Sequence, residues 1–234
     1  MKIPISKRLL CCASFVPSGA RVADVGCDHG YLGIWLLREG IASFVDASDL
    51  RPLPLEKAQA NSRQFGTHDR MRFHVADGLQ AIAPGSVDTV VCAGMGGDCI
   101  AHILQDAPWV RDENITLILQ PQTSGNDLRR YLGENGFSIE TEQLVKDGGF
   151  LYFTLVAKYG GGAPLTPGAQ YLSPQLLHCG SPLLPEYFDR VITALERTVA
   201  GISRSRKEED LARISYYQSA LEEVREMRNQ YERT

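Results

Sequence analysis

Residues 21–38 read RVADVGCDHGYLGIWLLR, and this stretch decides the fold. Its first five residues form a strand-like run, whereas residues 31–38 carry the apolar spacing of a helix. Gly26 and Gly30 lie in the turn between the two, where glycine lets the backbone bend sharply. A strand followed by a glycine-rich turn and a helix predicts the first unit of a parallel α/β sheet.

The same alternation continues along the chain for about another hundred residues. Because parallel strands need crossover connections, strand-like runs separated by helical stretches predict a doubly wound sheet with helices on both faces. The predicted strands are 21–25, 43–47, 71–75, 87–93 and 115–119, and the helices predicted between them include 31–38, 55–64, 98–106 and 126–135.

The alternation of strand-like and helical stretches ends after residue 136. Two strand-like runs, 137–146 and 150–159, are joined by a KDGG turn (146–149), which indicates a β-hairpin and an antiparallel strand at the end of the sheet. Five parallel strands closed by such a pair resemble the sheet of class I methyltransferases. A dinucleotide-dependent dehydrogenase would usually continue with another strand and helix instead.

The rest of the chain is predicted to form a helical appendage. A GGGAP run (160–164) and a proline-rich connector to Pro185 precede two long amphipathic stretches, which predict an antiparallel, coiled-coil-like helical hairpin. The predicted organisation is a Rossmann-like sheet domain over residues 1–162, and a linker with the helical hairpin over residues 163–234.

Composition bounds the class of protein. The 234 residues are 44% hydrophobic and 22% charged, which is ordinary for a globular chain, and the formal charge of -4 argues mildly against a nucleic-acid partner. None of the six cysteines forms a CxxC pair, so we expect reduced thiols, no metal site and a cytoplasmic location. The basic and apolar start resembles a short signal peptide, but a strand follows at once, so we expect an N-terminal helix capped by Ser6. No apolar run is long enough to span a membrane.

The turn after the first predicted strand is the first candidate site, because ligands of open α/β sheets bind beyond the carboxyl ends of the strands. A dinucleotide-binding turn needs GxGxxG, but Asp28 stands at the first glycine position of that pattern, ahead of Gly30 and Gly33. A carboxylate there would repel a pyrophosphate and would suit a ligand with a positive charge. S-adenosylmethionine carries both a sulfonium and an ammonium group.

Three further loops complete the candidate cofactor site. Asp49, about 20 residues past Gly30, is expected to accept hydrogen bonds from ribose hydroxyls in preference to Asp46, although either could instead cap the next helix. Asp77 with Gly78 is expected to receive the adenine amine, the alternative being an ordinary Asp-Gly turn. The AGMGG loop (93–97) offers small residues beside the transferred methyl group.

Several motifs together resemble the TrmK family of bacterial tRNA (adenine-N1)-methyltransferases. They are DVGCDHGYL (24–32), DGL (77–79), AGMGG (93–97), LILQP (117–121) and NDLRRYL (126–132), and the similarity extends from ISKRL (5–9) to the C-terminal hairpin. The resemblance implies methylation of N1 of adenine 22 in tRNA, with S-adenosylmethionine as the methyl donor. The family often has Asn where Gln122 stands, which leaves the role of that position open.

With this activity, five residues receive expected roles in the reaction. Asp28 could stabilise the positive charge of the methylated base or hold the cofactor's ammonium, and His29 could accept a proton. Tyr31 could stack on the base, and the amides of Gln120 and Gln122 could read its edge; His29 and Tyr31 could also only shape the turn. The expected cofactor contacts are Asp24, Gly26, Cys27, Asp28, Gly30, Ser48, Asp49, Leu50, Asp77, Gly78, Ala93, Gly94 and Met95.

Basic residues at the N-terminus and at the tip of the helical hairpin are expected to contact the tRNA backbone. They are Lys7, Arg8, Arg204, Arg206 and Lys207. The sequence leaves open whether the chain is a monomer or a homodimer. The alternatives are a methyltransferase for another RNA, a small molecule or a protein, a nicotinamide-dependent oxidoreductase, and a binding protein whose hairpin docks a partner.

Overall fold

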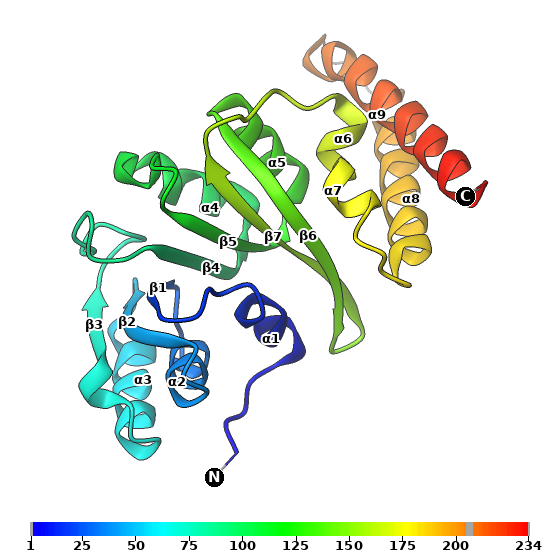
Figure 1. The fold of residues 1–234 in the computed structure, drawn as a ribbon. Coiled ribbons are helices and arrows are strands. Elements are labelled where there is room, and N and C mark those ends of the chain that lie inside the picture. Colours follow the sequence, from blue (N-terminus) through cyan, green and yellow to red (C-terminus); the bar gives the residue numbers. More distant parts are fainter. Residues whose placement is uncertain (1, 205–207, 234) are drawn as a thin grey trace.

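The computed structural model describes residues 2–204 and 208–233, in which seven strands form one mixed sheet with helices on both faces (Figure 1). The strand order is β3-β2-β1-β4-β5-β7-β6, in which β1 to β5 are parallel and β7 is antiparallel to both β5 and β6. This confirms the predicted α/β class and the antiparallel pair at one edge. The strands are β1 (Ala20–Val25), β2 (Ala42–Asp49), β3 (Met71–Val75), β4 (Thr89–Gly96), β5 (Thr116–Thr123), β6 (Phe137–Asp147) and β7 (Phe150–Tyr159).

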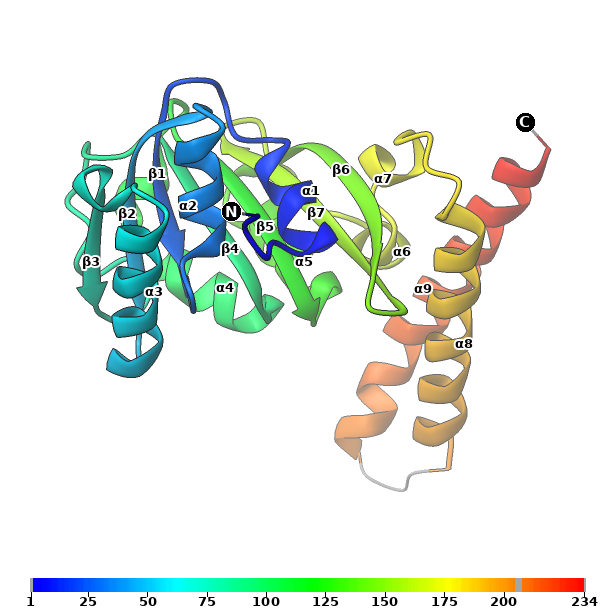
Figure 2. The same cartoon turned by 90° about the horizontal axis from the view of Figure 1, so that it is seen from below.

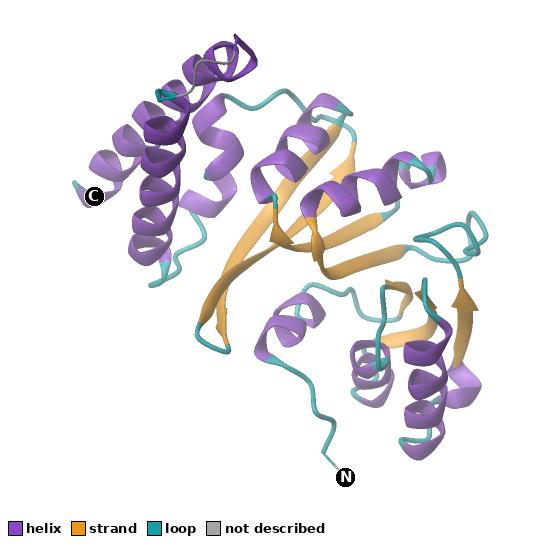
Figure 3. Cartoon of the chain, turned by 180° about the vertical axis from the view of Figure 1, so that it is seen from behind, coloured by secondary structure: helices purple, strands orange, loops and turns teal. Residues whose placement is uncertain are grey.

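The sheet separates two apolar cores, because successive side chains of a strand point to opposite faces. In β4, Val90 and Cys92 belong to the core with α4 and α5, whereas Val91 belongs to the core with α1, α2 and α3. Both faces are therefore covered, as Figure 3 shows, and the strand ends remain for a ligand. The helices are α1 (Lys7–Ala13), α2 (Tyr31–Arg38), α3 (Pro52–Gln64), α4 (Gly97–Gln105) and α5 (Gly125–Glu134), with 3-10 turns at His68–Arg70 and Pro108–Val110.

Helix α1 confirms the expected N-terminal helix. The Ser6 hydroxyl accepts a hydrogen bond from the Leu9 N–H (3.3 Å) and so caps the helix, while Cys12 and Ala13 are buried. The helix packs against β6 and β7. Because these strands lie beside β5, α1 brings Arg8 close to the end of β5, far along the sequence.

Strands β4 and β5 both extend beyond their predicted ends, to Gly96 and Thr123. The pairing of their extensions is irregular, with register shifts on either side of Met95. Gly94 has a left-handed φ of 86°, and its N–H donates to the side chain of Gln120 (3.1 Å). The residues predicted to lie in two loops are therefore held on a bulged strand extension.

The C-terminal part contains α6 (Pro167–Tyr171), α7 (Pro174–Leu177), α8 (Leu184–Ile202) and α9 (Glu208–Glu232). The sequence predicts only a connector before Pro185, but Thr166 and Ser173 cap two short helices, each with proline at its first position. Helices α8 and α9 form the expected hairpin, which projects beyond the sheet on the side of β6 and β7 (Figure 2). Within the described residues, no helix is long and apolar enough to cross a membrane.

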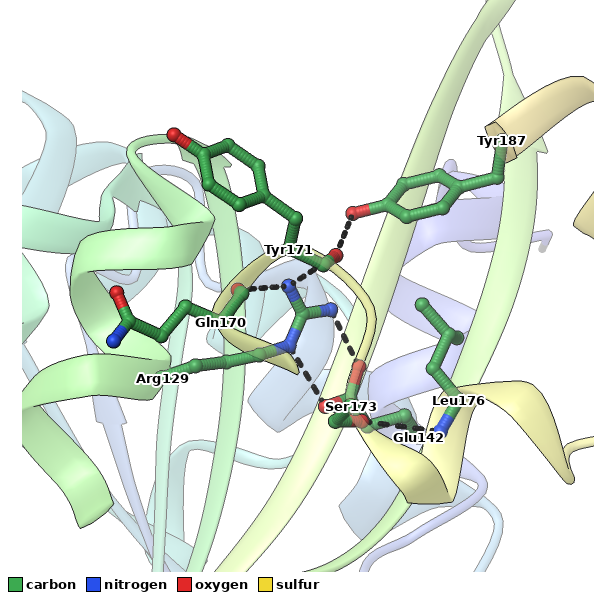
Figure 4. Close-up of polar contacts among 7 residues, drawn as sticks. All are labelled: Arg129, Glu142, Gln170, Tyr171, Ser173, Leu176 and Tyr187. Atoms are coloured by element: carbon green, nitrogen blue, oxygen red, sulfur yellow. Dashed lines mark hydrogen bonds and ion pairs between the residues drawn. The ribbon is translucent and has the colours of Figure 1, made fainter. Parts of the chain in front are cut away.

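A buried ion pair ties this C-terminal part to the sheet domain (Figure 4). Arg129 of α5 donates through Nε to Glu142 Oε1 (2.9 Å) and through Nη2 to Oε2 (2.6 Å), and both side chains are almost fully buried. The remaining Nη1 donates to the carbonyls of Gln170 (3.1 Å) and Tyr171 (3.0 Å) at the end of α6. Ser173 completes the cluster by donating to Glu142 Oε1 (2.7 Å). The position of α6 is thus fixed relative to α5 and β6.

Candidate functional site

A cavity of about 560 Å³ lies at the carboxyl ends of β1, β2 and β4. Its lining includes Asp24, Gly26, Cys27, Asp28, Ser48, Asp49, Leu50, Asp77, Gly78, Ala93, Gly94 and Met95, which are all of the predicted cofactor contacts except Gly30. His29, Tyr31 and Gln122 also line it, together with Arg8. The four loops that the sequence singles out therefore meet in one place, as the topology of a parallel sheet requires.

The turn after β1 has a backbone shape that few residues can adopt. Gly26 has a φ of 69°, a left-handed conformation that favours glycine, and a Cβ atom there would lie 2.8 Å from the Met95 methyl group, which would have to shift. Asp28 also has a left-handed φ of 48°, a conformation that Asp tolerates better than most residues. Gly30 does not line the cavity; it begins α2 and lies against Ala58.

The structure separates the two acidic residues of β2. Asp49 lines the cavity, and its carboxylate accepts hydrogen bonds from the N–H of Asp28 (3.2 Å) and the N–H of Arg51 (3.0 Å). Asp46, only 2% exposed, is instead paired with Arg72 (3.0 Å) and His74 (2.9 Å) and does not line the cavity. The predicted preference for Asp49 agrees with this placement, and Asp46 is engaged in holding β3.

Asp24 is the most buried carboxylate of the cavity, at 4% exposure. Burial raises its pKa to about 7, against the lowering effect of a hydrogen bond from the Gly33 N–H (3.3 Å), and the nearby charge of Asp49 raises it further. Asp28 differs because its side chain is largely exposed and lies 3.6 Å from His29 Nε2. The cavity therefore combines a desolvated carboxylate with a solvated one, and a cationic group in it would favour ionisation of Asp24.

The third and fourth loops close the cavity from the other side. Ser48 at the end of β2 donates to the carbonyl of Gly78 (2.9 Å), which fixes the Asp77-Gly78 turn against the second strand. Met95 lies beside the Gly26 turn, as the short distance from its methyl group indicates. Asp77 and Met95 thus both line the shared space.

Gln120 does not take the predicted base-reading position. It is completely buried, and its Oε1 accepts from Arg8 Nη1 (2.5 Å) and from the Gly94 N–H, while its Nε2 donates to the Pro121 carbonyl (3.0 Å). The amide holds Arg8 and the bulge at Gly94, because β5 continues past this residue. Gln122, two residues further along, is exposed and does reach the cavity.

The basic residues predicted to contact tRNA divide into three groups. Arg8 points into the cavity instead of lying on the outer surface. Lys7 is exposed on α1, and Arg204 is exposed in the turn that follows α8. Arg206 and Lys207 lie outside the described residues.

Two cationic residues of the cavity were not predicted to lie there, for different reasons. Arg51 stands two residues after Asp49 and could have been found from that position. Arg8 enters the cavity because α1 packs against β6 and β7, a long-range contact without a signal in local spacing. The same contact places the Arg8 guanidinium 5.9 Å from the ring centre of Tyr152, on the hairpin strand β7.

Comparison with known proteins gives consistent matches along the chain. Residues 5–155 match a family described as a methyltransferase domain. The tRNA (adenine(22)-N(1))-methyltransferase of Bacillus subtilis is 32% identical over 159 residues, which are 68% of this chain and 67% of that protein. The crystal structure of B. subtilis TrmK superimposes with a TM-score of 0.85 at 26% identity, covering 97% and 99% of the two chains. Sp1610 of Streptococcus pneumoniae has a TM-score of 0.81 at 33% identity over 94% and 99%, and it has also been solved with S-adenosyl-L-methionine.

Proposed function

This chain belongs to the methyltransferase family that contains B. subtilis TrmK, and we propose that it likewise transfers a methyl group from S-adenosylmethionine to N1 of adenine 22 in tRNA. One observation carries the proposal. The cavity at the strand ends is acidic, with four aspartates among its lining, and it stands where this fold binds its cofactor. A nicotinamide-dependent oxidoreductase is not favoured, since those carboxylates would repel a pyrophosphate.

The residues of the cavity fit the chemistry of the cofactor. Asp49 would accept the ribose hydroxyls, and Asp77 would accept the adenine amine. Asp24 and Asp28 would face the cationic groups, and because burial raises the pKa of Asp24, a cation beside it would favour its charged form. Gly26, Cys27, Ser48, Leu50, Gly78, Ala93, Gly94 and Met95 would supply the remaining walls.

The reaction needs alignment more than proton transfer. When bound, the cofactor supplies a methyl group whose bond to sulfur breaks as the adenine N1 lone pair forms a bond to it, so that positive charge passes from sulfur to the base. Asp28 is exposed enough to face that charge, and Tyr31 and Gln122 line the same cavity and would orient the base. His29, beside Asp28, would serve as the acceptor of any proton that leaves.

For Arg8 we propose a different role from the tRNA contact expected of it. Its guanidinium is held by Gln120 at the β4–β5 side of the cavity, away from Asp49 and Asp77 at the β2 and β3 ends. The cofactor's amino-acid tail carries a carboxylate, which needs a cation in an otherwise acidic cavity. We assign that carboxylate to Arg8, because guanidinium matches the geometry of a carboxylate.

Replacing Arg8 with Gln is expected to weaken binding of S-adenosylhomocysteine about tenfold or more, because it removes a hydrogen bond between charged groups. Binding of 5′-methylthioadenosine, which lacks the amino-acid tail, should change less than about twofold, since no such hydrogen bond is lost. Isothermal titration with both ligands measures the difference, and Lys7→Gln on the same helix is the matched control. An equal loss for both ligands, or a loss of tRNA affinity alone, would contradict the assignment.

The tRNA itself is proposed to contact both parts of the chain. The sheet domain, residues 1–162, would hold the target adenosine, and residues 163–234 would contact the backbone elsewhere. Lys7 and Arg204 are exposed cations suited to phosphate contacts, and we propose the same role for Arg206 and Lys207. A tRNA-modifying enzyme of this kind would act in the cytoplasm.

Nucleoside analysis tests the proposed function. The full chain is incubated with unmodified tRNA and S-adenosylmethionine labelled on its methyl group, and the tRNA is then digested to nucleosides. We expect the label in 1-methyladenosine. Label in a different nucleoside, or none at all, would contradict the proposal.

A further inference from the structure

A second cavity lies next to the cofactor cavity, between the end of β5, the hairpin strand β7 and helix α8. It has a volume of about 170 Å³ and is lined by residues that include Gln122, Thr123, Tyr152, Phe153 and Arg190. A wider hollow of about 370 Å³ adjoins it and shares Gln122, Thr123, Tyr152 and Arg190. Gln122 also lines the cofactor cavity, so one side chain connects all three spaces.

Tyr152 stands at the boundary between the two cavities. It is half-buried, it lines the second cavity, and its ring centre is 5.9 Å from the guanidinium carbon of Arg8, which lines the cofactor cavity. The ring of Phe150 lies 6.4 Å from that of Tyr152 and is 68% exposed. An aromatic surface that remains accessible beside a reaction site suits the flat face of a nucleobase.

Arg190 supplies the positive charge of the second cavity. It is exposed on α8, and its Nη1 donates to the Leu151 carbonyl, which holds the guanidinium across the space between helix and sheet. A guanidinium has five N–H donors, so this contact leaves others for a ligand. Glu186, the acidic residue of the adjoining hollow, is paired with Lys146 (2.8 Å). This pairing reduces the electrostatic repulsion between its carboxylate and a bound phosphate.

We propose that the second cavity binds the nucleotide that adjoins the target adenosine in the tRNA strand, with its base on Tyr152 and its phosphate at Arg190. The inference rests on the proposed function. The target base must enter the cofactor cavity to meet the methyl group, and Gln122 and the Arg8–Tyr152 pair separate that cavity from the second one. A base drawn from its stack loses stacking energy, and a platform for its neighbour offsets part of that loss.

The test compares Tyr152→Leu with Tyr152→Phe in tRNA binding, measured with S-adenosylhomocysteine present. Base–aromatic stacking is lost only in the Leu variant, so we expect its affinity for intact tRNA to fall about tenfold. This lies within the range of about 5- to 150-fold for one stacked base. The affinity of the Phe variant should stay within about twofold of the wild-type value. Tyr159→Leu, on the same strand but outside both cavities, is the matched control. A far-UV circular dichroism spectrum and a urea midpoint that match those of the wild-type chain show that the variant is folded.

Transcripts with an abasic site identify the stacked base. We expect the effect of Tyr152→Leu to disappear with an abasic site at position 21 or at position 23, next to the target. If Tyr152→Leu still weakens binding of both transcripts, the proposal is overturned. It is also overturned if the effect of Tyr152→Leu disappears only with an abasic site at position 22, because Tyr152 would then stack on the target base itself. If the wild-type chain methylates tRNA and Tyr152→Leu gives either of these results, only this inference is overturned. If the wild-type chain fails to bind or methylate tRNA, the proposed function is overturned as well.

Discussion

Replacing Asp49 with Ala is expected to weaken binding of S-adenosylhomocysteine about 100-fold or more. Each hydrogen bond to a charged acceptor contributes about 1.5–3 kcal/mol, and a carboxylate at this position accepts two ribose hydroxyls. The residue also accepts from the N–H of Asp28 and the N–H of Arg51, so its loss loosens the turn on which Asp28 is carried. Isothermal titration measures the change directly.

Asp46 provides the matched control for Asp49, because it is an aspartate on the same strand. Its carboxylate holds Arg72 and His74, away from the cavity. We expect Asp46→Asn to lower the free energy of unfolding while affinity for S-adenosylhomocysteine stays within about twofold, since the variant keeps every cavity contact. If Asp49→Ala bound this ligand as tightly as the wild-type chain, the cofactor assignment of the whole cavity would be wrong.

Replacing Arg129 with Met is expected to destabilise the fold by about 3–5 kcal/mol, because it leaves the carboxylate of Glu142 buried without a partner. Both residues are 1% exposed, and all the polar atoms of the pair are hydrogen-bonded to each other, to Ser173 or to the carbonyls of α6. The guanidinium also lies 3.9 Å from the ring centre of Phe153. Urea denaturation followed by circular dichroism measures the change.

Two further variants isolate the cause of this effect. Arg130, the next residue on α5, forms an exposed pair with Asp127 (2.8 Å), and Arg130→Met should cost less than about 1 kcal/mol. Adding Glu142→Leu to Arg129→Met removes the unpaired charge, so the double variant should be more stable than Arg129→Met alone. A double variant that is less stable than the single one would show that packing of the arginine chain, not its charge, holds this junction.

Much of the site could be predicted because it follows from the order of elements. In a parallel sheet, loops that lie far apart in sequence meet at one edge, so the glycine turn at Gly26 and the acidic residues Asp49 and Asp77 were expected to line one cavity, as they do. Spacing alone favoured Asp49 over Asp46, and the structure adds a physical reason, since Asp49 ends β2 whereas Asp46 lies within it. Only Arg72 and His74, contributed by β3, show which of the two is already occupied.

Other features depend on contacts that local spacing does not encode. Gln120 is buried because β5 continues to Thr123, which turns a predicted loop residue into part of the strand interior. Arg8 reaches the cavity only through the packing of α1 on β6 and β7. The short helices α6 and α7, in contrast, carry a local signal that the sequence reading passed over, a Thr or Ser cap followed directly by proline.

Mapping the methylated position tests the central claim most directly, namely that the acidic cavity serves methyl transfer to N1 of adenine 22. N1 lies on the pairing edge of adenine, so its methylation stops reverse transcription at that nucleotide. Unmodified tRNA is incubated with S-adenosylmethionine and either the wild-type chain or Asp49→Ala, and is then read by primer extension. We expect a new stop at position 22 with the wild-type chain and a much weaker one with the variant. A stop at another position, or equal stops with both proteins, would contradict the account.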